Sequence, residues 1–170
     1  SEYNARRREC DNAFKKLKEK KPNLKSLCDL KPKDAEFIKS NLQNKEMRRA
    51  LYVSAEQDRV NQAVKAIKKG SVKDLGNLIL KTHDGLSKLY EVSTAELDIL
   101  VEEAINMDGV MGVCMIGTGF GGGVLMFLKK TEVENVIENL YSKYKEKTRR
   151  DADVYIVKPS NGARIFPIEE

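Results

Sequence analysis

The sequence predicts an α+β fold, in which helices pack on one face of a mostly antiparallel sheet behind an N-terminal helical layer. Two observations predict it. Through most of residues 6–105, apolar residues recur every three or four positions, as they do in amphipathic helices. Short apolar runs bounded by glycine then replace this period, as in strands, before the helical period returns. This order of elements favours a ferredoxin-like, split β-α-β arrangement.

The first elements are predicted from helix breakers and capping residues. A helix is expected over residues 6–17 and must end before Pro22, which cannot continue it. After a connector, Asp34 is expected to begin a short helical stretch, because aspartate accepts hydrogen bonds from free N–H groups there.

Two longer helices are expected to form an antiparallel pair. The first covers residues 45–68, with Gly70 as its C-terminal cap. Its apolar residues recur every three or four positions and form one face, consisting of Val53, Val60, Ala63, Val64 and Ile67. The second begins near Val72, and its apolar positions are Val72, Leu75, Leu78 and Ile79.

A capping box predicts the start of the next helix, over residues 93–105. Ser93 can accept a hydrogen bond from the backbone N–H of Glu96, and the Glu96 side chain can reach back. The apolar runs "GVMGVCMI" and "VLMFL", at residues 109–116 and 124–128, are short and glycine-bounded, so we expect two strands.

The last elements follow the same logic. Thr131 and Glu134 form a second potential capping box ahead of an amphipathic helix. A strand is expected over residues 151–159, where Pro159 stops it, and a last strand over residues 163–168.

Length and composition favour one domain over residues 1–170, with a helical part at 1–92 and a split β-α-β part at 93–170. Of the 170 residues, 41% are apolar, which is enough for a core. The net charge of +5 is mild, and the densest basic segment, residues 15–25, is almost without interleaved aromatic side chains. We therefore expect no nucleic-acid partner.

Cysteine and histidine usage restricts the compartment and the chemistry. The odd count of three unpatterned cysteines points to free thiols in a reducing, cytoplasmic environment. No apolar run reaches membrane-spanning length, so no membrane partner is expected. His83 is the one histidine, and no ligand cluster accompanies it, so no metal site is predicted.

The connection between the two predicted strands contains five glycines, at positions 117, 119, 121, 122 and 123. It matches G-x-G-x-x-G literally, but an apolar run expected to be a strand follows, where a dinucleotide site needs a helix. A Walker-type loop is excluded because G-K-[ST] is absent. Two interpretations stay open. The loop is a plain strand connection, or a backbone loop that lies close against a phosphate site.

Four segments resemble a known family. Residues 112–128, "GVCMIGTGFGGGVLMFL", resemble the third conserved motif of the GHMP kinases in its galactokinase form, G-[SA]-R-M-T-G-[GA]-G-F-G-G-C. Residues 82–100 resemble S-H-x-S-L-R-x-D-Y-x-V-S-C-P-E-L-D, and residues 48–60 resemble R-A-x-H-V-x-x-E-x-x-R-V. Residues 1–10 are similar to S-x-Y-N-x-R-R-x-E-C. The segments occur in the family's order and span nearly the whole chain.

The resemblance implies the carboxy-terminal domain of an ATP-dependent sugar kinase, a galactokinase that converts galactose and ATP to galactose 1-phosphate and ADP. The N-terminal kinase domain, with the phosphate loop and the catalytic groups, would be missing, and the chain, which begins without methionine, would be an inactive fragment. ATP and Mg²⁺ are implied for the full-length parent, with none bound tightly here and no catalytic residue in this part.

The resemblance also implies roles for two parts of this chain. Tyr3 matches the tyrosine that contacts the sugar. A positioning loop beside the phosphates would consist of Gly117, Thr118, Gly119, Phe120, Gly121 and Gly122.

Three departures leave alternatives open. Cys114 and Ile116 replace the motif's arginine and threonine, and Tyr52 replaces a histidine. A related GHMP sugar kinase such as N-acetylgalactosamine kinase, or a non-catalytic regulatory or binding module of kinase ancestry, would also fit. His83 and the i, i+3 pair of Glu56 and Arg59 are expected to be structural.

Overall fold

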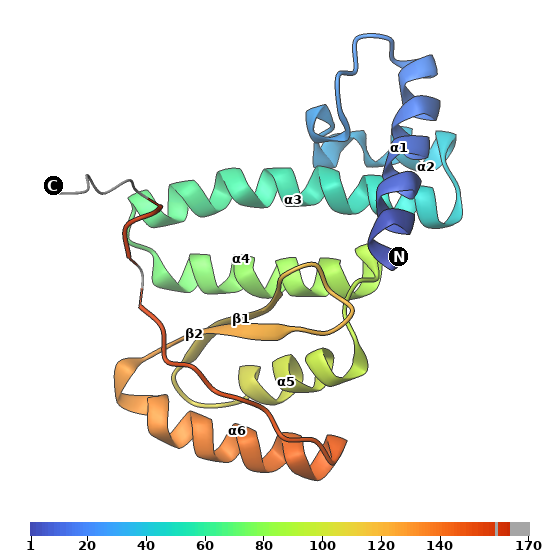
Figure 1. Ribbon diagram of the computed structural model, residues 1–170. Coiled ribbons are helices and arrows are strands. Elements are labelled where there is room, and N and C mark those ends of the chain that lie inside the picture. The colour runs from blue at the N-terminus through green and yellow to red at the C-terminus, as the bar shows by residue number, and fades with distance from the viewer. Residues whose placement is uncertain (159, 164–170) are drawn as a thin grey trace, which may run out of the picture.

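The computed structural model describes residues 1–158 and 160–163. The helices are α1 (Glu2–Lys20), α2 (Ala35–Asn41), α3 (Asn44–Lys68), α4 (Val72–Gly85), α5 (Ala95–Ile105) and α6 (Val133–Thr148). The strands are β1 (Val110–Ile116) and β2 (Gly123–Leu128). Single turns of 3₁₀-helix occupy Leu27–Asp29, Pro32–Asp34 and Lys130–Glu132, and a π-helical turn occupies Leu86–Tyr90. Figure 1 shows α1 and α2 packed against one end of α3.

The N-terminal helical layer has its own core. Its buried side chains are Ala13, Leu17, Leu24, Leu27, Leu30, Ile38, Leu42 and Ala50, from α1, α2, the turns between them and the start of α3. The predicted first helix is confirmed and extends to Lys20, directly before the segment that Pro22 interrupts. The short helix after Asp34 is also confirmed.

The antiparallel pairing of α3 and α4 is confirmed (Figure 1), but the apolar face predicted for α3 is buried only in part, at Val53 and Ala63. Val60, Val64 and Ile67 are 51%, 47% and 63% exposed. The buried residues of α3 are Arg49, Ala50, Tyr52, Ser54 and Ala66. The start of α3 packs on α1 and α2, and its length packs on α4, so tertiary contacts select another face than the apolar stripe.

The two strands pair antiparallel, which confirms the α+β class. Val113 lies opposite Met126 and Met115 opposite Val124, with an irregularity between Val110 and Gly112. One face of this pair packs on α5 and α6, through a cluster of Val101, Ala104, Val113 and Leu140. In Figure 1, α4 runs on the other side of the strands from α5 and α6.

Both predicted capping boxes are displaced. The N-cap of α5 is Thr94, whose Oγ1 accepts a hydrogen bond from Leu97 N at 3.4 Å, whereas the buried Ser93 hydroxyl has no partner among the described residues. α6 begins after Glu132, because a 3₁₀ turn over Lys130–Glu132 delays it. In both cases the helix begins one residue later than the capping-box spacing predicts, with Thr94 and Glu132 as the N-caps in place of Ser93 and Thr131.

The strand expected at residues 151–159 does not form within 151–158. Its apolar residues Val154, Tyr155, Ile156 and Val157 are 49–79% exposed. A strand is stable only when a neighbouring strand satisfies its backbone N–H and C=O groups, and none of the described strands pairs with this segment. Pro159 and residues 164–168 of the predicted last strand lie outside the described residues.

α4 lies unusually close to β1 because two glycines face each other. A Cβ atom on Gly76 would lie 1.8 Å from Met111 O, and one on Gly112 would lie 2.9 Å from Gly76 Cα. Real Cβ atoms do not approach other heavy atoms this closely. The glycines therefore set the spacing between helix and strand, and with it the position of the loop after β1.

We expect Gly76→Ala to lower the free energy of unfolding of the chain by about 3 kcal/mol, since the methyl group overpacks this contact. Alanine is otherwise the better helix residue by about 1 kcal/mol, so the steric cost must exceed that gain. Gly70→Ala is the matched control. It has φ +66° and open space, so only the left-handed strain of about 1 kcal/mol applies. Urea unfolding followed by circular dichroism measures both, and a Gly76→Ala chain as stable as wild type would contradict the packing.

Candidate functional site

The loop between β1 and β2 has a backbone that few residues other than glycine adopt. Gly117, Gly119, Gly121 and Gly122 have φ values of +88°, +84°, +127° and +98°, and Phe120 has +61°. A positive φ is strained for residues with a Cβ atom, so the loop needs its glycines for conformation alone. A simple two-residue hairpin turn would need fewer.

Gly119 is also required for contact. A Cβ atom there would lie 2.3 Å from Val92 O and 2.7 Å from Val92 Cβ. The next residue uses the same carbonyl, because Phe120 N–H donates to Val92 O at 2.8 Å. The loop is therefore docked at its midpoint on the segment between the π-helical turn and α5.

Gly117 and Gly121 differ from Gly119 because no atom lies within 4 Å of a Cβ built on either residue. Their backbone is open on the surface of the described structure. Another backbone or a ligand can approach it closely without meeting a side chain of the loop. The loop thus combines one docked glycine with two open ones.

The start of α1 lies beside this loop. The Arg6 guanidinium carbon lies 5.3 Å from the centre of the Phe120 ring. Arg6 Nε donates to Tyr90 O at 2.9 Å, and Nη2 donates to Glu91 O at 2.6 Å. Tyr3 precedes Arg6 by three positions on the same helix and is 53% exposed. Two sequence-predicted sites, Tyr3 and the glycine loop, therefore belong to elements in contact.

A buried arginine supports the same segment from α3. Arg49 is 0% exposed, and it donates to Glu9 Oε2, Leu89 O and Glu91 Oε2 at 2.7, 2.6 and 2.7 Å. These contacts lower the pKa of the Glu91 carboxyl below its usual value, with the Arg49 hydrogen bond as the largest cause. The pairing joins α1, α3 and the left-handed residue Glu91.

His83 is structural, as its surroundings show. It is 7% exposed, its Nδ1 accepts a hydrogen bond from Met115 N at 3.3 Å, and its Nε2 lies 3.1 Å from Asp98 Oδ1. Because Nδ1 is an acceptor, the neutral ring carries its proton on Nε2. Burial lowers the pKa of His83 below its usual value, against the opposing effects of Asp98, Asp84 and Glu102. The ring thus holds the end of β1, directly before the loop.

The remaining candidates do not form a reactive group. Burial raises the pKa of the half-buried Cys114 thiol to about 11, so it stays protonated at neutral pH and is a poor nucleophile. Glu56 and Arg59 form the expected i, i+3 ion pair at 2.6 Å, and Thr82 donates to Glu56 at 2.9 Å. Within residues 1–158 and 160–163, no three His, Cys, Asp or Glu side chains are placed to hold a metal ion. No helix in the same ranges is long and apolar enough to cross a membrane.

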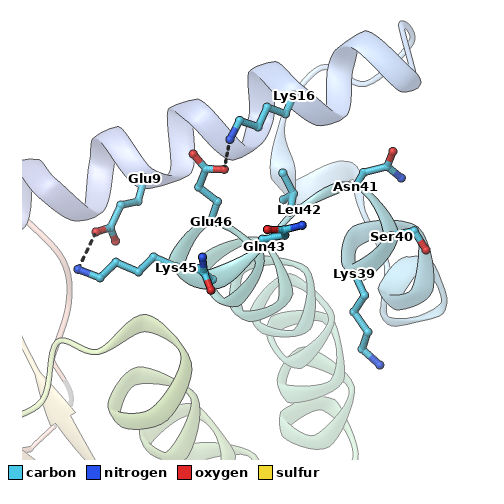
Figure 2. A pocket seen from close by; sticks show the side chains of 10 residues that line it. Glu9, Lys16, Lys39, Ser40, Asn41, Leu42, Gln43, Lys45 and Glu46 are labelled. Carbon is cyan, nitrogen blue, oxygen red and sulfur yellow. Dashed lines mark hydrogen bonds and ion pairs between the residues drawn. The ribbon is translucent and has the colours of Figure 1, made fainter.

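A cavity of about 710 Å³ lies elsewhere, where α1, the end of α2 and the start of α3 meet. Figure 2 shows its polar lining, in which Lys16 pairs with Glu46 and Lys45 with Glu9. None of the sequence-predicted site residues lines it. Lys39, the remaining charged residue of the lining, pairs with Glu36 at 2.8 Å, so each charge in the lining has a partner.

Sequence reasoning missed the residues that hold the loop. Arg6, Arg49 and Glu91 received no role, although Arg6 lies in the first matching segment and Arg49 in another. One signal was available for Arg49, which stands four residues before Val53 and so lies on the same side of the helix as the first residue of the predicted apolar face. A charged residue on the buried side of a helix must find partners. No signal indicated Val92, whose role rests on its backbone carbonyl.

Comparison with known proteins gives consistent matches. Residues 63–146 match the family model described as "GHMP kinases C terminal". The chain is 36% identical over 163 residues to a galactokinase of Clostridium perfringens strain SM101, covering 95% of this chain and 42% of the relative. It is 37% identical over 164 residues to a galactokinase of Fusobacterium nucleatum, with 96% and 42% covered. The chain thus spans about two fifths of the length of these relatives.

A solved structure is similar over most of the fold. The crystal structure of Lactococcus lactis galactokinase complexed with galactose superposes with a TM-score of 0.87 at 29% sequence identity. The match covers 91% of this chain and 40% of that one. The helical N-terminal layer and the strand pair are therefore parts of one known architecture.

We expect the free energy of unfolding of the chain to fall as the pH drops below about 6.5, the usual pKa of histidine. The folded pKa of His83 is lowered, so the unfolded state binds the proton more readily, and stability is complete only above the unfolded pKa. Protonation also removes the acceptor that Met115 N–H uses. The slope cannot exceed about 1.4 kcal/mol per pH unit for one group.

Urea unfolding at pH 7.5, 6.5 and 5.5 measures this dependence. His83→Asn is the control, since its Oδ1 can replace Nδ1 as an acceptor but does not titrate. Between pH 7.5 and 5.5, the free energy of unfolding of the variant should lack the pH dependence that His83 contributes in the wild type. Equal slopes in both proteins would show that His83 does not titrate there.

Proposed function

We propose that this chain is the carboxy-terminal part of an ATP-dependent galactokinase of the GHMP kinase family. The matches to galactokinases at 36% and 37% identity over nearly the whole chain support a galactokinase-like parent. The galactose in the Lactococcus lactis structure supports galactose as the sugar. The proposed reaction transfers the γ-phosphoryl group of ATP to the anomeric hydroxyl of galactose. Residues 1–170 would form one domain, divided near residue 92.

The observation that carries the proposal is the docked glycine loop. Gly119 and Phe120 fix its middle on Val92, while Gly117 and Gly121 keep their backbone open. Phosphoryl transfer depends mainly on positioning and on charge stabilisation. In this proposal, Gly117, Thr118, Gly119, Phe120, Gly121 and Gly122 position the phosphate site by close backbone approach.

The loop is not a nucleotide site by itself. β2 follows it directly at Gly123, so no helix N-terminus directs N–H groups at a phosphate there. No lysine stands in the loop or directly after it. Charge for the phosphates must come from a part of the kinase outside this chain, the proposed N-terminal domain.

Tyr3 is proposed to contact the sugar. Tyr3 is half exposed on the first turn of α1, so part of its side chain is open to a ligand. A phenol both donates and accepts hydrogen bonds, which suits sugar hydroxyls. The contact between Arg6 and Phe120 holds this turn near the glycine loop, as a kinase needs for sugar and phosphate.

Among the described residues, no group of three His, Cys, Asp or Glu side chains is placed to hold a metal ion. In the proposed parent, Mg²⁺ and most contacts to ATP would involve the N-terminal kinase domain. In this proposal, the residues of this chain bind the sugar through Tyr3 and position the phosphate site through the glycine loop. The parent is proposed to act in the cytoplasm, where ATP is available and thiols stay reduced.

One observation favours a second candidate, a non-catalytic binding or regulatory module. Cys114 stands where the family motif has arginine, and its thiol is neutral at physiological pH because burial raises its pKa to about 11. The positive charge that the motif arginine would supply at position 114 is therefore missing. A related sugar kinase, such as an N-acetylgalactosamine kinase, would differ from the first proposal only in its substrate.

We expect the full-length protein encoded by the reading frame that contains this chain to release ADP when supplied with ATP, Mg²⁺ and galactose. The 170-residue chain alone should show no sugar-dependent ADP release, since its glycine loop carries no charged residue and its sequence contains no phosphate-binding serine loop. A coupled ADP assay with galactose, N-acetylgalactosamine and arabinose measures both proteins.

Each outcome separates the alternatives. Preference for N-acetylgalactosamine over galactose would change the proposed substrate but support the proposed kinase activity. A folded full-length protein without turnover on any sugar would favour the non-catalytic module. Turnover by the 170-residue chain at ordinary kinase rates would refute the proposed division between the two parts.

A further inference from the structure

We propose that Arg6 is a positioning residue that sets the distance between the sugar-contacting turn of α1 and the glycine loop. This inference rests on the proposed kinase function. Arg6 itself contacts neither the proposed sugar site nor the proposed phosphate site as a ligand group. It acts through Tyr3, which it places, and through Phe120, which it covers.

The guanidinium is fully committed within the protein. Its Nε and Nη2 donate to the carbonyls of Tyr90 and Glu91, at distances from 2.6 to 3.2 Å. Its Nη1 lies 3.5 Å from Glu2 Oε2 and 3.8 Å from Glu9 Oε1. The side chain is only 11% exposed. A planar fork held at this many points has little freedom, so it can fix the helix to the segment below.

The same segment holds the loop. Val92, the residue after Glu91, accepts Phe120 N–H at 2.8 Å and packs on Gly119. Phe120 adopts φ +61°, a strained value for a residue with a side chain, and its ring faces the Arg6 guanidinium at 5.3 Å. Arg6 therefore meets the loop twice, directly through the ring and indirectly through neighbouring carbonyls.

These contacts have a consequence for catalysis. Tyr3 lies on the turn that Arg6 fixes, and the loop lies on the other side of the same contact. In the proposed kinase, the first element faces the sugar and the second faces the phosphates. A displacement of about 1 Å between reacting groups can reduce a rate about 100-fold without removing any binding contact. Arg6 should therefore affect kcat far more than KM.

The neighbouring arginine provides a matched control. Arg7 is exposed on the same helix, and neither a hydrogen bond nor an ion pair of its side chain is found among the described residues. Arg6→Lys and Arg7→Lys change the same functional group and keep the charge. Lysine cannot reproduce the fork of two donors to Tyr90 O and Glu91 O, nor the stacking on Phe120. Only the Arg6 variant should disturb the position of the Tyr3 turn of α1 relative to the glycine loop.

The experiment uses the full-length protein with ATP and galactose, and with the other sugars of the panel. Arg6→Lys should lower kcat by about 10- to 100-fold, with the KM for the sugar within about threefold of wild type. Arg7→Lys should retain wild-type kcat. Circular dichroism and thermal unfolding at the assay temperature establish that both variants are folded, so that loss of kcat is not loss of protein.

Phe120→Leu tests the direct contact from the other side, since leucine keeps the backbone N–H but removes the aromatic face. If the guanidinium and the ring act through one contact, Arg6→Lys combined with Phe120→Leu should lower kcat no more than the worse single variant. Additive losses would overturn the direct contact.

Three further outcomes would also count against the inference. An active wild type whose Arg6→Lys variant keeps its kcat overturns the role of Arg6 and leaves the kinase function intact. A variant whose only change is a higher KM assigns Arg6 to binding instead. A folded wild type that is inactive with every sugar overturns the proposed function and this inference with it.

Discussion

Three consecutive residues, Tyr90 to Val92, receive hydrogen bonds from three separate parts of the chain. Arg6 of α1 donates to the carbonyls of Tyr90 and Glu91, and Arg49 of α3 donates to the Glu91 carboxylate. The glycine loop donates through Phe120 N–H to Val92 O. The segment begins with the last residue of the π-helical turn and leads toward α5, and Glu91 has a left-handed φ of +55°. The helical layer and the strand layer meet at this short, irregular piece of backbone.

Arginine suits this junction better than an apolar contact would. A buried ion pair adds little net stability, because removing the charges from water offsets most of their attraction. Breaking one side of such a pair costs more, since the remaining charge is left without its partner. Arg49 is fully buried and pairs with Glu9 and Glu91. An arrangement of α1 and α3 that separated these residues would leave the buried Arg49 guanidinium without a carboxylate partner. The cluster therefore specifies one geometry more than it stabilises the fold.

Helix positions could be predicted from the sequence because their signals are local. The breakers at Pro22 and Gly70, and the period of apolar residues, reproduced the helices and the two strands within a few residues. Burial could not be predicted as well. Val60, Val64 and Ile67 form a regular apolar stripe on α3 and still face solvent, because packing on α1, α2 and α4 selects another face.

In the candidate site, too, local features could be predicted from the sequence and tertiary contacts could not. The excess of glycine after β1 indicated a loop with unusual backbone, and the φ values agree. That Gly119 is needed for contact depends on Val92, 27 positions away in the sequence, and the open space at Gly117 depends on which segments the fold leaves away from it. The strand expected at 151–158 had the right composition, but a strand also needs a partner, which no composition supplies.

The charges around the loop limit what it can contribute to the proposed kinase. Arg6 is the cation found against the loop, yet its donors already serve two carbonyls, and two carboxylates lie within 4 Å. Cys114 is neutral. A phosphate placed at Gly117 or Gly121 would therefore find open backbone but no uncommitted positive group of the loop itself. Stabilisation of a phosphoryl transition state needs such charge close by. In the proposed kinase this chain thus supplies geometry, and the charge that completes the site has to approach the loop from another part of the protein.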